Sequence, residues 1–228
     1  MSLGAVLTTT LAGVVFGLAL AAPPGPMNAI IAEESVLRGW WAGFRAGLGA
    51  MSADAIFLLL SLAGVVAALD GLPRVRAAMV LVGGGLMWYF AVDAARNTRA
   101  ALTPTDEGAD GGAGFRKTFV LALTNPYQIL FWLTVGVGLL APGRIDVLSQ
   151  TPYLGARLTG VLIVETGTPA LVLGLFGGIA VWITGFPATL VAARRRVESL
   201  APLVAGASAL VLGGFGTLFL IDGLTTLL

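Results

Sequence analysis

The sequence predicts an all-α integral membrane protein with six transmembrane helices, arranged as two inverted three-helix repeats whose first and fourth helices are broken by proline. The 228-residue chain is 57% hydrophobic and only 11% charged, whereas soluble domains are about 25% charged. Its apolar segments run continuously for about 20 residues, which favours membrane helices over the alternating strands of a barrel. A proline-rich break around Pro26 is echoed around Pro126, and such paired interruptions indicate internal repeats.

The expected spans follow the apolar runs in chain order. They cover residues 3–31, 44–69, 77–93, 118–141, 158–191 and 201–224. We expect one transmembrane domain over residues 1–228, with repeat one at about 1–95, a flexible cytoplasmic linker at about 96–115 and repeat two at about 116–228. Three spans in each half give the two halves opposite orientations in the membrane.

The first span is interrupted by the stretch Ala21-Ala22-Pro23-Pro24-Gly25-Pro26-Met27-Asn28. Proline removes a helical N–H and clashes with the preceding turn, so a helix cannot continue here. Within a membrane, backbone groups freed in this way are tolerated only where they line a cavity or are buried in protein. We therefore expect Gly25, Pro26 and Asn28 to contribute to a substrate-binding site.

The second half repeats this pattern in Thr124-Asn125-Pro126-Tyr127-Gln128, inside the fourth span. Asn125, Pro126 and Gln128 are therefore predicted to form the other part of the substrate site. The uncharged amides of Asn28, Asn125 and Gln128 can bind a ligand's carboxylate and amine beside a helix N-terminus. Alternatively, they satisfy the backbone groups that the prolines free, and both roles can hold together.

Asp54 is the sharpest candidate for ion coupling. It lies some ten residues into the second span, which is about 15 Å deep at the helical rise, and a carboxylate there costs on the order of 3 kcal/mol. Small residues share its helical stripe, namely Gly43, Gly47, Ala50, Ser61 and Gly64, so Asp54 should face the packed side. It would carry a proton or cation or pair with a substrate ammonium; the alternative is an acid locked in an interhelical hydrogen bond.

Other acids carry weaker expectations. Glu165, beside Gly167 and Pro169 near the outer end of the fifth span, is a second candidate for ion coupling or simply reaches the membrane interface. Glu33 and Glu34 follow the first break, where we expect solvation at the interface rather than a role in a cytoplasmic vestibule.

The composition excludes several classes of chemistry. The chain has no cysteine and no histidine, which excludes disulfides, thiolate metal sites and imidazole-based metal, haem or proton-relay sites. We therefore predict no cofactor and no metal, and no enzyme, because no nucleophile–base pair is visible. The longest basic run, at residues 194–196, sits at a helix end and indicates no nucleic-acid partner.

Loop charges predict the orientation. Nine of the 13 Lys and Arg residues fall on one side of the expected spans and four on the other. The positive-inside rule then places the linker in the cytoplasm and both termini outside a plasma membrane. The glycine clusters at residues 83–85 and 213–216 are expected to allow close helix packing, and glycine-rich faces also permit a homodimer.

These motifs resemble those of the LysE/RhtB-type amino-acid exporters. The resemblance rests on Pro24-Gly25-Pro26-Met27-Asn28, then Arg38-Gly39, Gly47, Gly49 and Asp54, and on Thr124 to Trp132 as a counterpart of the family's Asn-Pro-Lys fourth span. It covers most of the chain. One departure is Tyr127, which stands where the family often has lysine, so the basic group is missing there.

The resemblance implies export of amino acids or similar small metabolites, driven by a proton or cation gradient. We expect a zwitterionic substrate between the two breaks, with Asp54 coupling transport to protons and Glu165 assisting. A divalent-cation transporter or channel of the same superfamily is the alternative, because carboxylate and amide oxygens suit hard cations. A non-transporting membrane scaffold is a further alternative, which the depth of Asp54 disfavours.

Overall fold

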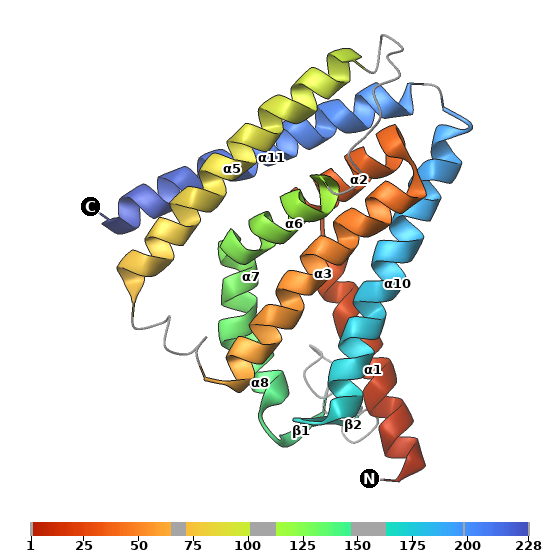
Figure 1. Ribbon diagram of the computed structural model, residues 1–228. Helices are drawn as coiled ribbons and strands as arrows, with labels where there is room; N and C mark the ends of the chain where they lie inside the picture. Colours follow the sequence, from red (N-terminus) through yellow and green to blue (C-terminus); the bar gives the residue numbers. More distant parts are fainter. Residues whose placement is uncertain (1, 65–71, 101–112, 147–162, 198, 228) are drawn as a thin grey trace, which may run out of the picture. The chain divides into compact units, whose positions relative to one another are not determined.

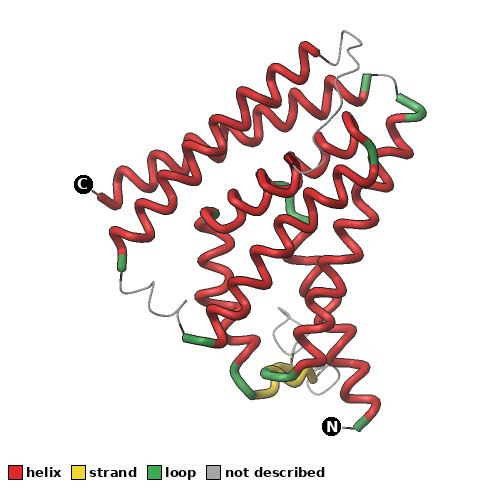
Figure 2. The backbone as a smooth tube through the Cα atoms, viewed as in Figure 1, coloured by secondary structure: helices red, strands yellow, loops and turns green. Residues whose placement is uncertain are grey.

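The computed structural model describes residues 2–64, 72–100, 113–146, 163–197 and 199–227. These residues are almost entirely helical, with one two-stranded sheet (Figures 1 and 2). The chain divides into two compact units, one of Met1–Ala22 with Thr134–Trp182 and the other of Pro23–Leu133 with Ile183–Leu228. We call them the hairpin unit and the main unit.

The helices and strands follow one another in this order: α1 Leu3–Ala21, α2 Pro26–Arg38, α3 Trp40–Leu62, α5 Pro73–Ala100, α6 Ala113–Thr124, α7 Pro126–Phe131, the π-helix η1 Trp132–Gly136, α8 Val137–Leu140, β1 Gly143–Asp146, β2 Ile163–Thr166, α10 Pro169–Arg194 and α11 Leu200–Leu227. Residues 101–112 of the expected linker lie outside the described residues.

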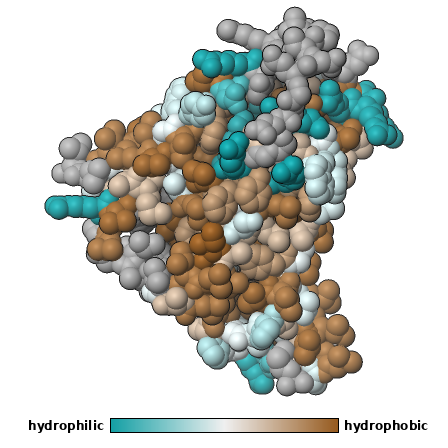
Figure 3. Space-filling view, viewed as in Figure 1, coloured by the Kyte–Doolittle hydropathy of each residue, from teal (hydrophilic) through white to brown (hydrophobic). Residues whose placement is uncertain are grey.

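Five helices of the described residues are long and apolar enough to cross a membrane: Leu3–Ala21, Trp40–Leu62, Ala77–Arg96, Pro169–Arg194 and Leu200–Thr226. The segment expected as the fourth span is not among them, because it is divided into the short helices α6, α7, η1 and α8. Hydrophobic side chains cover most of the face seen in Figure 3, as the low charge content predicts.

Both expected breaks are present. α1 ends at Ala21 and α2 begins at Pro26, while α6 ends at Thr124 and α7 begins at Pro126. Each second helix thus starts on proline. At the first helical position a backbone N–H would have no intrahelical partner, so proline loses no helical hydrogen bond there.

In the hairpin unit, α1 packs closely along the first part of α10 through glycines. A Cβ added at Gly13 would lie 2.9 Å from the Cα of Gly174, and one at Gly17 would overlap the carbonyl oxygen of Leu175. The hydroxyl of the buried Thr9 accepts a hydrogen bond from the backbone N–H of Glu165 at 3.3 Å. These contacts attach α1 to both α10 and β2.

In the main unit, α2, α5, α6 and α11 supply one apolar core that includes Ile30, Met87, Leu121 and Leu212. The glycine clusters pack as expected, since a Cβ on Gly84 would lie 3.0 Å from the carbonyl oxygen of Gly216. Polar side chains also join the helices. The Thr118 hydroxyl donates to the Ala46 carbonyl at 2.5 Å, and that of Ser208 donates to the Ala29 carbonyl at 2.8 Å.

The prediction for the fifth span is wrong at its beginning. Residues 163–166 form β2, which pairs antiparallel with β1, and α10 starts only at Pro169. Gly167 has a φ of 71°, a left-handed conformation that glycine adopts without strain. The Thr168 hydroxyl then accepts from the Leu171 N–H at 3.4 Å. This turn separates strand from helix and places Glu165 on a strand, whereas the sequence predicted a helix there.

Candidate functional site

Asp54 lies within the membrane-crossing helix α3 and is only 5% exposed. The prediction that it faces the packed side is confirmed. On either side of it, α3 approaches its neighbours through glycines. A Cβ on Gly47 would lie 2.5 Å from the Cβ of Ile183, and one on Gly49 would overlap Phe115 and Thr118.

Two neutral donors hold the Asp54 carboxylate. The side-chain amide of Gln128 donates to Oδ1 at 2.6 Å, and the indole N–H of Trp132 donates to the same oxygen at 2.8 Å. Gln128 comes from α7, while Trp132 is the first residue of the π-helix η1 and is 2% exposed. The site therefore links the second expected break directly to Asp54.

Trp132 was not among the residues expected to function. Its spacing from Gln128 is a usable signal, because residues four apart lie on the same face of a helix. The π-helix that begins with it is also informative, since such turns occur frequently at functional sites.

The other amides at the breaks bond to the backbone. Asn28 donates from Nδ2 to the carbonyl of Pro23 at 2.8 Å, and Asn125 accepts through Oδ1 from the N–H of Tyr127 at 3.1 Å. Both side chains thus satisfy groups that the prolines free, whereas Gln128 instead contacts Asp54. That the two breaks bind one ligand together stays a prediction.

Gly25 leaves space at the start of α2. Its backbone is fully extended, and a Cβ built on it meets no heavy atom within 4 Å. No side chain caps this helix start. The first N–H groups of α2 therefore lack an intrahelical partner, as at any helix N-terminus.

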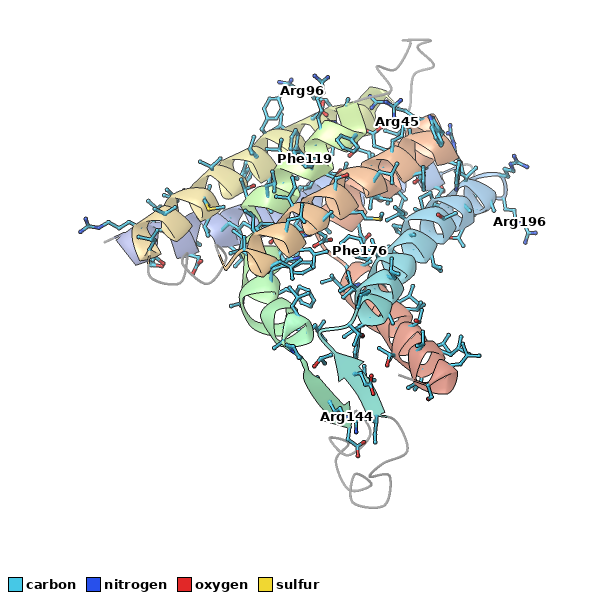
Figure 4. The ribbon with its side chains drawn as sticks, turned by 60° about the horizontal axis from the view of Figure 1, so that its bottom comes forward. Arg45, Arg96, Phe119, Arg144, Phe176 and Arg196 are labelled. Carbon is cyan, nitrogen blue, oxygen red and sulfur yellow. The ribbon has the colours of Figure 1, made fainter. Side chains whose placement is uncertain are left out.

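Glu165 lies on β2 in the hairpin unit, opposite Arg144 in the β1–β2 register. Its carboxylate accepts from Arg144 at 3.4 Å, and the Arg144 side chain is 73% exposed. Figure 4 shows Arg144 on this hairpin. Such an exposed pair contributes little to stability.

Glu33 and Glu34 are buried, so the expectation of interfacial solvation is wrong. For Glu34 the reason is a set of charged partners within the main unit. Arg38 donates to both carboxylate oxygens of Glu34 at 2.8 and 2.9 Å, and Lys117 lies 4.0 Å from the same group. Lys117 also contacts Asp93 at 2.5 Å.

α2 is fixed further at its C-terminal end. The Arg194 guanidinium donates to the carbonyl oxygens of Val36 and Leu37, where helix carbonyls lack intrahelical partners. The described residues contain no group of three or more His, Cys, Asp or Glu side chains placed to hold a metal ion.

Comparison with known proteins points to one family. A family model described as LysE type translocator matches residues 18–223. The chain is 33% identical over 132 residues to YcgF of Bacillus subtilis, which is named for amino acid efflux; this match covers 56% of the chain and 62% of YcgF. It is 30% identical over 128 residues to the leucine efflux protein of Salmonella typhimurium, covering 55% of the chain and 59% of that protein.

A longer match is to an uncharacterized membrane protein of Pseudomonas aeruginosa, 28% identical over 213 residues, which covers 90% of both chains. The matched region thus spans less than two thirds of the two efflux proteins. No solved structure matches the chain.

Proposed function

This chain belongs to the LysE type translocator family, and on that basis we propose that it is a secondary transporter that exports amino acids or related zwitterions in exchange for protons. The observation that carries the proposal is Asp54, a buried carboxylate in a membrane-crossing helix, held by Gln128 and Trp132. The names of the efflux relatives support the substrate class.

The coupling role of Asp54 follows from its surroundings. An ionised carboxylate away from water is costly unless it is hydrogen-bonded and paired with positive charge. Gln128 and Trp132 supply hydrogen bonds but no charge. A proton can neutralise the negative charge that remains on Asp54. We therefore propose that this carboxylate binds and releases the coupling ion. We propose Glu165, already paired with Arg144, only as an assisting acid.

The two breaks are proposed to bind the rest of the substrate. The start of α2 at Gly25, Pro26 and Asn28 carries no side-chain cap, and the N-terminal end of a helix favours a negative charge such as the carboxylate of a zwitterion. At the second break, Asn125 caps α7 with Pro126 at its first position, and this helix start presents Gln128 to Asp54.

We propose six membrane crossings in two inverted repeats. Five are the long apolar helices, and the sixth is the interrupted segment from α6 to α8. The corresponding positions of the α1/α2 and α6/α7 breaks support the repeat. The loop charges support a plasma-membrane orientation with both termini outside.

The test is transport by the purified full chain in proteoliposomes loaded with a panel of amino acids, with and without an imposed pH gradient. We expect movement of one class of amino acid, with leucine the first to examine, and faster movement when protons flow down their gradient in the direction opposite to the substrate. Movement of divalent cations with no movement of any amino acid would contradict the proposal and favour the cation transporter instead.

A further inference from the structure

We propose that the headgroups of anionic phospholipids bind at one end of the main unit, where arginines from two distant segments of the chain meet beside a cluster of aromatic rings. The arginines, which we call the basic end, are Arg45, Arg194, Arg195 and Arg196. The rings, which we call the ring cluster, are Trp40, Trp41 and Phe44. The inference goes beyond export, because it names a lipid partner and holds whatever solute is transported.

Contacts between a side chain and the backbone bring the two segments together. The guanidinium of Arg194, at the C-terminal end of α10, donates to the carbonyl oxygens of Val36 and Leu37 in α2. The chain passes from α2 to α3 through the single residue Gly39, whose φ of 92° is one that glycine adopts without strain. The end of α10 therefore lies against the α2–α3 turn, and two further arginines follow it directly in the chain.

This surface carries an excess of positive charge. Arg195 and Arg196 are exposed, and Figure 4 shows Arg196 extending away from the helices. In the sequence, residues 36–45 contain no acid, and residues 190–199 contain one, Glu198. The arginines therefore outnumber the acids in the two segments that meet here.

The acids of α2 do not cancel this charge. Glu33 and Glu34 are buried within the main unit. Glu34 pairs with Arg38, and it packs against α6, where a Cβ on Gly114 would lie 3.0 Å from its carboxyl carbon. Arg38 is thus compensated, whereas the four arginines of the basic end remain to attract anions. Clusters of four or more basic residues at the end of a membrane helix are typical of sites for anionic lipid.

The ring cluster lies on the membrane side of the arginines that end α10. The indole N–H of Trp40 donates to the carbonyl of Thr184 at 3.0 Å. Thr184 precedes Arg194 by ten residues, which is about 15 Å along a helix. The ring centroid of Phe44 lies 5.1 Å from that of Trp40 and 5.5 Å from that of Trp41. Because tryptophan rings favour the membrane–water interface, this order of charge outside and rings inside matches the headgroup region of a lipid leaflet.

Trp41 and Arg45 bring a ring and a charge onto the same face of α3. They are four residues apart, so their side chains are neighbours on the helix surface. The Trp41 side chain is 59% exposed. Side chains on a helix lean toward its N-terminus, so the long side chain of Arg45 extends its guanidinium toward the start of α3 while its stem covers apolar surface. One lipid can then contact the indole with its apolar part and the guanidinium with its phosphate.

The exposed indole favours a lipid over a soluble anion. Arginine binds phosphate oxygens from either source. Trp41 adds apolar contact area next to a helix that is long and apolar enough to cross a membrane, and only an anion with an apolar part uses that area. The partner that fits both features is a phospholipid with a net negative headgroup.

The test measures lipid binding to the purified full chain in detergent by native mass spectrometry. The probes are phosphatidylglycerol and phosphatidylcholine with the same acyl chains, so that they differ in headgroup charge. We expect the chain to prefer phosphatidylglycerol. Each arginine near the surface contributes about 5-fold in affinity for an anionic lipid, so Arg195→Gln with Arg196→Gln should lower the preference by about 5- to 25-fold. Arg195→Lys with Arg196→Lys keeps both charges and should keep most of the preference.

The matched control is Arg74→Gln with Arg144→Gln, which removes two positive charges from exposed arginines elsewhere in the chain. The control should leave the preference unchanged. Trp41→Leu should weaken the binding of both lipids by a similar factor, because the ring contacts the part that the two lipids share. Circular dichroism of each variant verifies that its helix content is retained.

The proposal is overturned if the unaltered chain binds the two lipids equally, if Arg195→Gln with Arg196→Gln keeps the full preference, or if the control pair lowers it as much. Glycerol phosphate that displaces phosphatidylglycerol at equal concentration would also overturn it and would identify a soluble anion as the ligand. Because none of these measurements involves transport, failure of this proposal leaves the export function untouched, and failure of export leaves the lipid site untouched.

Discussion

The indole of Trp132 allows the contribution of one hydrogen bond to be measured. In Trp132→Phe, Asp54 loses the donor at 2.8 Å and keeps only the amide of Gln128 at 2.6 Å. Hydrogen bonds between membrane helices contribute about 0.6 kcal/mol on average and up to about 1.7. Bonds to charged groups contribute about 1.5–3 kcal/mol. Because both partners are buried and the acceptor is a carboxylate, we expect a loss of about 1.5–2 kcal/mol in the free energy of unfolding.

The assay is unfolding in detergent by titration with dodecyl sulfate, followed by circular dichroism. Trp88→Phe is the matched control. Trp88 donates at 3.1 Å to the neutral Thr217 hydroxyl and is 45% exposed, so the same substitution should cost about 0.5 kcal/mol. A double-mutant cycle of Trp132→Phe with Asp54→Leu, a side chain that has no acceptor oxygen, separates the hydrogen bond from the volume that phenylalanine leaves empty. Equal losses at Trp132 and Trp88, together with no coupling in the cycle, would refute the reasoning.

Three further predictions use the same unfolding assay. Gly17→Ala should lower the free energy of unfolding by about 1–3 kcal/mol, because the added Cβ overlaps the Leu175 carbonyl oxygen. Gly4→Ala in the same helix is the control, because its added Cβ meets nothing within 4 Å. Equal effects of the two substitutions would contradict the close α1–α10 contact. Asn125→Ala should cost about 1 kcal/mol, since it removes the cap of α7, and an unchanged stability would show that the cap contributes nothing. Lys117→Gln should lower the free energy of unfolding by about 2–3 kcal/mol, because the buried Glu34 carboxylate loses a nearby positive charge. Arg144→Gln, in an exposed ion pair, should lower it by less than about 1 kcal/mol. The reverse order would contradict the argument from burial.

Local sequence rules were enough to predict the helix breaks and the packed face of α3. Prolines at 23, 24, 26 and 126 end helices through covalent geometry alone. The position of Asp54 followed from the cost of a carboxylate in lipid and from the small residues on the same stripe. Neither argument needs knowledge of a distant partner.

The partners themselves could not be predicted in this way. Gln128 and Trp132 lie 74 and 78 residues from Asp54 along the chain, and the burial of Glu34 depends on Lys117, which comes from α6. The β1–β2 hairpin was missed because Ile163 and Val164 continue the apolar run of α10. Only the Gly167 turn and the start at Pro169 separate strand from helix.

The most direct test of the proposed mechanism is leucine accumulation against its gradient in proteoliposomes with an imposed pH gradient, compared between the unaltered chain, Asp54→Asn and Asp222→Asn, the same change on an exposed residue of α11. The proposal predicts accumulation by the unaltered chain and by Asp222→Asn. It predicts that Asp54→Asn still exchanges leucine at saturating concentration but no longer accumulates it. Full gradient-driven accumulation by Asp54→Asn would contradict the coupling role of this carboxylate.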